Sequence, residues 1–177
     1  MTQLNDKDNL ILQTFASIIM LVELQTQNFT QSDYFKSLQF QNTGIKKVIE
    51  SIGVGNQGVL LMSLYGMLVL PRELNLQIEF PDEYKTVNDF TKSKATNVSS
   101  NYASDNPEID FLRHIRNAVA HSKITMEGTD FLIKDENTRK GETFACKISR
   151  ENIGGVVHLL QHPFLKYSQR LQLNQNN

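Results

Sequence analysis

The chain has 177 residues, of which 40% are hydrophobic, and its formal net charge is −1. A chain of this length can bury a sizeable core, and we expect residues 1–177 to form a single domain. The near-neutral charge excludes proteins that coat nucleic acids through a strongly basic surface. The sole cysteine, Cys146, excludes an intrachain disulfide and a cysteine-based zinc site, and we interpret it as a small buried hydrophobe.

The first part of the chain is predicted to be helical. A helix is expected from Asn5 or Asp6 to about Gln27, because its apolar residues recur at three- and four-residue steps. Two shorter helical segments follow, one beginning near Ser32 and one covering residues 45–52. Together they indicate a helical N-terminal region.

Residues 57–70 form the most apolar stretch of the chain. As a helix this stretch would be hydrophobic on nearly all sides, which predicts a place at the centre of a bundle or in a dimer interface. We expect Tyr65 and Met67 to pack in the core. Pro71 ends the helix because its ring clashes with a continuing turn, and a further helix is predicted over residues 83–94.

The apolar runs do not predict a membrane protein. Residues 10–22 and 59–70 are both shorter than the roughly 20 residues that a membrane span needs, and we interpret both as buried helices. The N-terminus, MTQLNDKDN, is polar and lacks the basic start of a secretory signal. These features predict a cytoplasmic protein without membrane contact.

The segment from Pro107 to Lys123 is predicted to be a helix with two different faces. Residues 96–106 before it are polar and predict a flexible loop, and Asn106 and Pro107 are expected to cap and open the helix. At about 100° per residue, one arc is apolar and consists of Phe111, Leu112, Ile115, Ala118, Val119 and Ser122. The opposite arc is unusual for a solvated face because it carries more cations than carboxylates; it consists of Asp110, Arg113, His114, Arg116, Asn117, Ala120 and His121.

Arg116 and His121 lie on the two flanks of the polar arc, about 140° apart. Around one helix they are too far apart to meet easily over one phosphate, but they could converge in a groove between two copies of the helix in a two-fold dimer. The hexapeptide Arg116-Asn117-Ala118-Val119-Ala120-His121 resembles the motif of the HEPN superfamily. In that motif an arginine and a polar residue, often asparagine, precede a histidine late in a helical bundle.

After His121 the pattern changes from helical to alternating. Residues 124–126 and 131–133 flank a predicted hairpin turn, and residues 137–141 form a second turn. The next strand has one buried face, formed by Phe144, Cys146 and Ile148. We therefore predict a small antiparallel sheet of two or three strands.

Ser149 is expected to cap a final helix that runs to about Leu173, and Pro163 is expected to kink or divide it. The C-terminal QLNQNN is expected to fray. The predicted fold class is mainly α: a HEPN-like helical bundle with a small antiparallel β-hairpin or sheet inserted before the last helix. This order of elements also resembles compact plasmid- and phage-borne HEPN proteins.

The resemblance implies a metal-independent endoribonuclease with Arg116, Asn117 and His121 as catalytic residues and with no cofactor. The 2′-hydroxyl of RNA attacks the adjacent phosphorus, and a cyclic phosphate and a 5′-hydroxyl result. Histidine suits the proton transfers because its pKa is near neutrality, and the arginine fork suits the charge that builds up on the phosphoryl oxygens. Asn117 could orient the imidazole or contact the phosphate. The implied partners are RNA, a second copy of the chain, and an antitoxin or regulatory protein in a toxin or phage-defence role.

Other interpretations of these residues remain open. Arg113 and His114 could line the groove as substrate-binding residues, or Arg113 could pair with Asp110 three residues earlier. We interpret His158 and His162 in the final helix as structural, and no spacing in the sequence predicts a metal site. The alternative functions are a non-catalytic HEPN-like module that binds RNA, a nucleotide or a partner protein, and a helical interaction protein in which the motif is coincidental.

Overall fold

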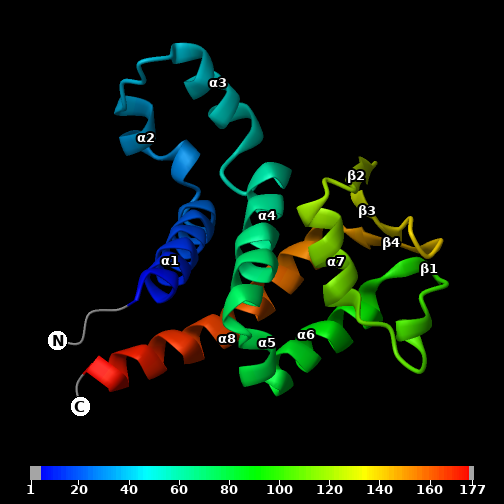
Figure 1. The fold of residues 1–177 in the computed structure, drawn as a ribbon. Coiled ribbons are helices and arrows are strands. Elements are labelled where there is room, and N and C mark those ends of the chain that lie inside the picture. The colour runs from blue at the N-terminus through cyan, green and yellow to red at the C-terminus, as the bar shows by residue number, and fades with distance from the viewer. Residues whose placement is uncertain (1–4, 176–177) are drawn as a thin grey trace.

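The computed structural model describes residues 5–175 and is mainly helical, as predicted (Figure 1). Short 3₁₀ turns and a π-helical turn, Tyr65–Val69, join several of the α-helices. The α-helices are α1 (Asp6–Thr26), α2 (Asp33–Ser37), α3 (Thr43–Ile52), α4 (Gln57–Leu64), α5 (Leu76–Glu79), α6 (Pro81–Lys94), α7 (Phe111–Ala120) and α8 (Arg150–Gln175).

An antiparallel sheet precedes the last helix, which confirms the predicted fold class. Its order is β1-β4-β3-β2, so that the chain-distant β1 lies beside β4. The predicted hairpins are confirmed, because Glu127 pairs with Asp130 and Asn137 pairs with Glu142. The strands are β1 (Thr96–Ser100), β2 (Ile124–Glu127), β3 (Asp130–Asn137) and β4 (Glu142–Ser149).

The prediction of a flexible loop over residues 96–106 is wrong. Thr96–Ser100 forms the edge strand β1, and Ala103–Asp105 forms a 3₁₀ turn. All five β1 residues are exposed, so this strand has no apolar alternation for a sequence pattern to detect. Its addition gives the sheet four strands instead of the predicted two or three.

The inner face of the sheet packs against α7 and α8 to form the main core. Phe131 and Ile133 on β3 and the alternating residues of β4 are buried. Cys146 is 0% exposed, as predicted, and burial raises the pKa of its thiol to about 12. The thiol is therefore a packed side chain and not a nucleophile.

The apolar stretch 57–70 is helical at the centre of the molecule but is not one regular helix. α4 ends at Leu64 and the chain continues through the π-helical turn. Gly66 lies in this turn where α1 crosses closely, because a Cβ there would lie 2.8 Å from the Thr14 side chain. Met67 is 0% exposed, as predicted, whereas Tyr65 is 45% exposed and the expectation that it packs in the core is wrong.

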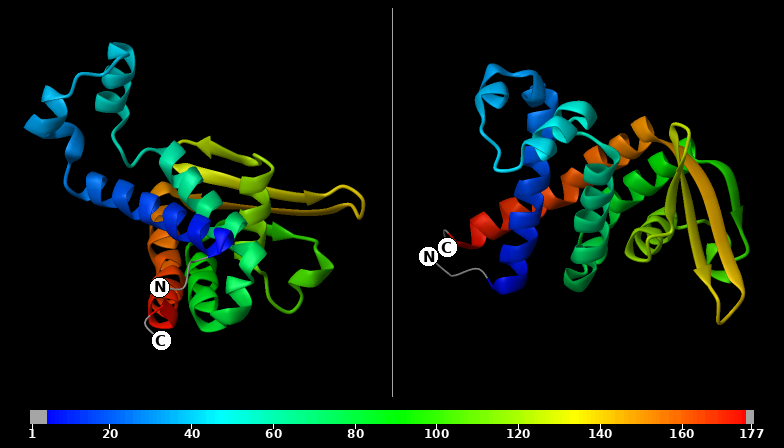
Figure 2. Two further views of the ribbon diagram at one scale, coloured as in Figure 1. Left: turned by 60° about the vertical axis from the view of Figure 1, so that its left-hand side comes forward. Right: turned by 90° about the horizontal axis from the view of Figure 1, so that it is seen from above.

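Residues 27–56 form an arm that projects away from the sheet and contains α2 and α3 (Figures 1 and 2). A small aromatic cluster holds the arm together, since the Phe35 ring contacts those of Phe29 and Phe40 at centroid distances of 5.3 and 5.7 Å. Lys46 Nζ donates to the carbonyl oxygens of Lys36 and Leu38. The arm therefore has its own small core, separate from the main one.

α1 is only partly buried, which corrects the prediction of a buried helix over residues 10–22. Ile11, Phe15 and Ile18 face the core, while Leu10 and Met20 are 54% and 63% exposed. Among the described residues, α1 is the one helix whose length and mean hydropathy of 1.3 would allow it to cross a membrane; α3 and the α4 segment would pass together as a pair bent by 84°. Core helices of soluble proteins share these properties.

α7 carries the HEPN-like motif and begins later than predicted. Its N-cap is Asp110, whose side chain accepts a hydrogen bond from the Arg113 N–H, and Pro107 precedes the helix after a cis peptide bond. Asn88 of α6 fixes this start, since its side chain donates to the Ile109 carbonyl and accepts from the Leu112 N–H. α7 is thereby held between α6, the sheet and the turn after α4.

α8 runs without interruption from Arg150, so Pro163 lies inside a helix that it does not divide. Ser149 caps its start as predicted, because its hydroxyl oxygen accepts a hydrogen bond from the Asn152 N–H. The expectation of a frayed C-terminus falls partly on residues 176–177, which lie outside the described residues.

Candidate functional site

Arg116 is a half-buried side chain on α7. Its guanidinium donates to the Asn117 side-chain oxygen at 3.3 Å and lines a cavity of about 210 Å³ between α7, the 3₁₀ turn Leu70–Leu74 and α6. Burial, followed by the charge of Arg72, lowers the pKa of Arg116. Even so, an arginine stays protonated at neutral pH, so the cavity has a cationic wall.

Asn117 connects Arg116 to a buried cluster of charged side chains. Its amide nitrogen donates to Asp135 Oδ2 at 3.0 Å, and the same oxygen accepts from His114 Nδ1 at 2.7 Å. These two hydrogen bonds of the Asn117 side-chain amide hold it between Asp135 on β3 and Arg116 on α7. In this structure Asn117 therefore orients the arginine and not the imidazole of His121.

His114 lies at the centre of this cluster and is 0% exposed. Its ring stacks on Phe144 at a centroid distance of 3.9 Å. Its Nε2 lies 3.0 Å from both Asp105 Oδ2 and Arg113 Nη2, so this nitrogen has a partner whether or not it carries a proton. The prediction that His114 faces the groove is wrong, because the ring is enclosed between α7 and the sheet.

Arg113 also belongs to the cluster. Its guanidinium pairs with Asp105 and lies over the Tyr102 ring, 5.3 Å from the centroid. The predicted pairing with Asp110 is wrong for the guanidinium, since the Asp110 carboxylate accepts from the Arg113 backbone N–H. Burial, together with the charge and hydrogen bonding of Asp135, raises the pKa of Tyr102 to about 12.

His121 occupies a different environment at the end of α7. It is the C-cap residue, and its side chain is exposed. The helix closes with a Schellman motif, in which the Lys123 N–H donates to the Ala118 carbonyl at 2.7 Å and the Ser122 N–H to that of Val119 at 3.3 Å. Ser122 has a φ of 54°, a left-handed conformation that is uncommon for a residue with a side chain. This turn fixes the backbone from which the imidazole projects.

The structure thus separates the predicted site residues into two groups. Arg116 and His121 reach solvent, whereas Asn117, Arg113 and His114 are engaged in the internal cluster. Among the described residues there is no group of three histidine, cysteine or carboxylate side chains that could hold a metal ion. The motif side chains that reach solvent are a guanidinium and an imidazole.

Sequence reasoning missed Asp105, Asp135 and Tyr102. Asp135 left a signal, because it follows Phe131 and Ile133 at two-residue steps and so lies on the inner face of β3. A carboxylate on that face needs a buried partner. Asp105 and Tyr102 lie in the polar segment before α7 and left no comparable pattern.

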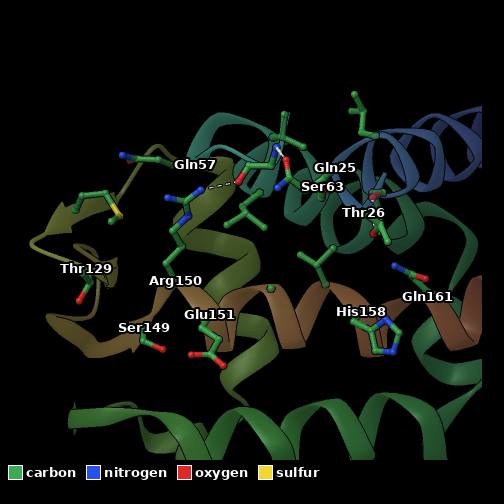
Figure 3. A pocket seen from close by; sticks show the side chains of 18 of the residues that line it. Gln25, Thr26, Gln57, Ser63, Thr129, Ser149, Arg150, Glu151, His158 and Gln161 are labelled. Atoms are coloured by element: carbon green, nitrogen blue, oxygen red, sulfur yellow. Dashed lines mark hydrogen bonds between the residues drawn. The ribbon is translucent and has the colours of Figure 1, made fainter. Parts of the chain in front are cut away.

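A larger cavity lies elsewhere in the molecule. It has a volume of about 810 Å³ and lies between α1, α4, α8 and the β2–β3 hairpin (Figure 3). Arg150 at its rim donates to the Gly55 carbonyl at 2.7 Å, and the Gly55 N–H donates to Gln25 Oε1. None of the motif residues lines this cavity, so it is distinct from the site on α7.

Comparison with known proteins agrees with the motif and the fold. Searches of curated proteins and of solved structures found no significant match. A family model described as HEPN pEK499 p136 matches residues 1–175. This match spans nearly the whole chain, includes the Arg116–His121 motif on α7, and confirms the resemblance: the chain belongs to the HEPN pEK499 p136 family of the HEPN superfamily.

Proposed function

We propose that this HEPN domain is a metal-independent endoribonuclease that acts in the cytoplasm as a homodimer. The observation that carries the proposal is the accessibility of Arg116 and His121, the two motif residues that the reaction requires. Arg116 is half-buried and bonded to Asn117 but still lines an open cavity, whereas full burial of either side chain in internal hydrogen bonds would favour a non-catalytic module. The matched family, whose superfamily commonly contains ribonucleases and toxins, supports the same function and a toxin or phage-defence role.

Arg116 is suited to stabilise the charge of a phosphoryl transition state. Its link through Asn117 to Asp135 limits the directions in which the guanidinium can point. Hydrogen-bond donors that are fixed in advance stabilise developing charge without having to reorganise. Arg116 would thus hold the scissile phosphate, while His121 side chains accept the proton of the attacking 2′-hydroxyl and donate one to the leaving 5′-oxygen.

An apolar surface beside His121 supports the dimer. Met62 and Tyr65 are 66% and 45% exposed, and with Val119 and Ser122 they line a cavity of about 320 Å³ along the C-terminal half of α7. A second copy packed here through a two-fold axis would cover these side chains and place two imidazoles in one groove. One His121 would then act as the base and the other as the acid.

The test is RNA cleavage in EDTA by the wild-type protein and by His121→Ala. We expect the variant to lose a factor of about 10² to 10⁴ in rate, as for other general acid–base residues, and the wild-type products to carry cyclic phosphate and 5′-hydroxyl ends. His158→Ala, which removes an exposed histidine of α8, is the matched control and should cleave normally. Equal cleavage by all three proteins, or none by the wild type, would refute the ribonuclease.

Sedimentation of the same preparations tests the shared site. The wild-type protein and both variants should be dimers at micromolar concentration. An active wild-type monomer under those conditions would contradict an active site formed by two chains.

A further inference from the structure

The cavity beside Arg116 contains a second arginine, Arg72, which belongs to the 3₁₀ turn Leu70–Leu74. We infer that this cavity is a subsite for a backbone phosphate of the RNA, next to the scissile phosphate, and that Arg72 is a substrate-binding residue. Only the assignment of this phosphate as the neighbour of the scissile one rests on the proposed ribonuclease. The binding of a phosphodiester in the cavity depends on the groups that line it.

The two guanidiniums lie close enough for the charge of Arg72 to lower the pKa of Arg116. Two like charges around a cavity of about 210 Å³ repel each other. The charges of Asp110 and Asp135 offset this in part for Arg116, but no described carboxylate forms a salt bridge with either arginine. An anion bound between them would remove the repulsion. Arginine binds phosphate oxygens through two parallel N–H donors, which gives such a site geometric specificity.

Tyr84 of α6 adds a neutral donor to the same cavity. Its side chain is 6% exposed and lines this cavity as well as the neighbouring one that contains Asp110. Burial raises the pKa of Tyr84, so the hydroxyl keeps its proton and can donate. A protonated hydroxyl at a cavity wall can donate a hydrogen bond to a ligand oxygen.

Asn75 and Gln77 complete the polar lining, and no carboxylate is among the described residues that form it. The other walls are apolar and include Leu68, Leu112 and Pro71. Two guanidiniums without a carboxylate in the same lining favour an anion over a cation. A cavity of about 210 Å³ has room for a phosphate group, and its two guanidiniums favour recognition of the RNA backbone.

Binding of a 2′-O-methyl RNA octamer tests the subsite, because the blocked 2′-oxygen prevents cleavage. We expect Arg72→Ala to weaken binding about tenfold, as for the loss of one charge-assisted contact, and to lower the slope of log affinity against log salt by about 0.7. Arg139→Ala, which removes an exposed arginine in the β3–β4 turn, should leave both quantities unchanged. Tyr84→Phe should weaken binding severalfold without changing the melting temperature.

Octamers with a single neutral methylphosphonate linkage locate the contact. A methylphosphonate at one linkage should weaken the binding of the wild-type protein about tenfold. The same linkage should not weaken the binding of Arg72→Ala any further. Equal weakening by Arg72→Ala and Arg139→Ala would overturn the subsite. The subsite would also be overturned if Arg72→Ala still weakened binding to every one of the methylphosphonate octamers. Stabilisation by inorganic phosphate alone that depends on Arg72, without a linkage effect, would assign the cavity to free phosphate and overturn the RNA assignment.

The two proposals fail differently in these experiments. If the wild-type protein cleaves no RNA but binds the octamer in an Arg72-dependent way at one linkage, the ribonuclease is refuted and the phosphate site stands. If cleavage depends on His121 while Arg72→Ala behaves like Arg139→Ala, the ribonuclease stands and the subsite is refuted.

Discussion

Two carboxylates and a guanidinium surround the buried imidazole of His114, and their hydrogen bonds reach Arg116 through Asn117. Burying such a cluster costs solvation energy, so its presence alone does not make the protein more stable. Removing one member is different, because the remaining charged groups stay buried without a partner. The cluster therefore ties the position of a solvent-accessible arginine to the integrity of the core.

We predict that Asp135→Ala lowers the free energy of unfolding by about 3 kcal/mol. The substitution leaves His114 Nδ1 and the Asn117 amide without their shared acceptor. Urea denaturation measures the change. The matched control is Glu136→Ala, the next residue on β3, whose ion pair with Lys123 is about half exposed and should contribute less than about 1 kcal/mol. Equal effects of the two substitutions would show that leaving His114 and Asn117 without their acceptor costs no more than breaking a surface ion pair.

At this scale the sequence predicted which side of α7 is polar but not the partners of all its side chains. Arg116 and His121 are accessible, as the helix pattern required. His114 falls about 40° from Ala118 at 100° per residue, on the border of the apolar arc, and Asp105 and Asp135 decide that it turns inward. Those carboxylates come from a 3₁₀ turn and from β3. Only tertiary packing brings them to α7, so a local pattern cannot predict the contact.

Individual elements meet closely where α6 crosses α8. Gly155 allows this contact, because a Cβ there would lie 2.7 Å from Phe90 Cζ, whereas nothing lies within 4 Å of a Cβ at Gly154. The two neighbouring glycines are both inside α8, and replacing either by alanine would raise helix propensity by about 1 kcal/mol. The two substitutions therefore differ only in what the added methyl group contacts, so each serves as the control for the other.

We predict that Gly155→Ala destabilises the protein by about 1–3 kcal/mol through overpacking against Phe90. Gly154→Ala should instead stabilise it by up to about 1 kcal/mol. Chemical denaturation of both variants measures the difference. A stabilising Gly155→Ala would mean that the Phe90 ring can move aside at little cost.

Elements with an apolar periodicity were predicted well, and elements defined by tertiary pairing were not. The caps at Asn5, Ser32 and Ser149 each accept a backbone N–H at the expected helix start. β1 escaped detection because its residues are all exposed and it is defined only by pairing with β4. α7 begins after Asp110 instead of Pro107, since the Asp110 side chain and the Asn88 contacts select the later start.

The whole molecule consists of a main core and a separate arm, residues 27–56, with little apolar contact between them. α3 illustrates the limit of sequence patterns at this scale. Its helix was predicted, but Ile45, Val48 and Ile52 remain about half exposed, and periodicity says only that such residues share a face. Regions with few buried contacts open at a lower free energy than the global fold.

We predict that amide hydrogens of α2 and α3 exchange faster than those of β3, β4 and α7. Phe35→Ala, which removes the 1% exposed centre of the arm's aromatic cluster, should speed exchange in the arm more than 100-fold, from a loss of about 3 kcal/mol. It should leave the main melting transition nearly unchanged. Exchange measured by mass spectrometry on peptides reports each region separately.

Phe164→Ala is the control, because Phe164 stacks on Phe15 in the main core at 5.3 Å. That variant should lower the global melting temperature. If Phe35→Ala lowered it equally, the arm and the main core would be one cooperative unit.

The closing turn of α7 has a mechanical consequence. Between His121 and the first residue of β2 only Ser122 and Lys123 intervene, and the Lys123 N–H and carbonyl are bound to Ala118 and to Lys134, respectively. The His121 imidazole thus projects from a short, hydrogen-bonded connection between α7 and the β2–β3 hairpin. A macromolecule bound to the exposed tip of this hairpin would therefore be connected to both motif residues, to His121 through Lys123 and to Arg116 through Asp135 on β3 and Asn117.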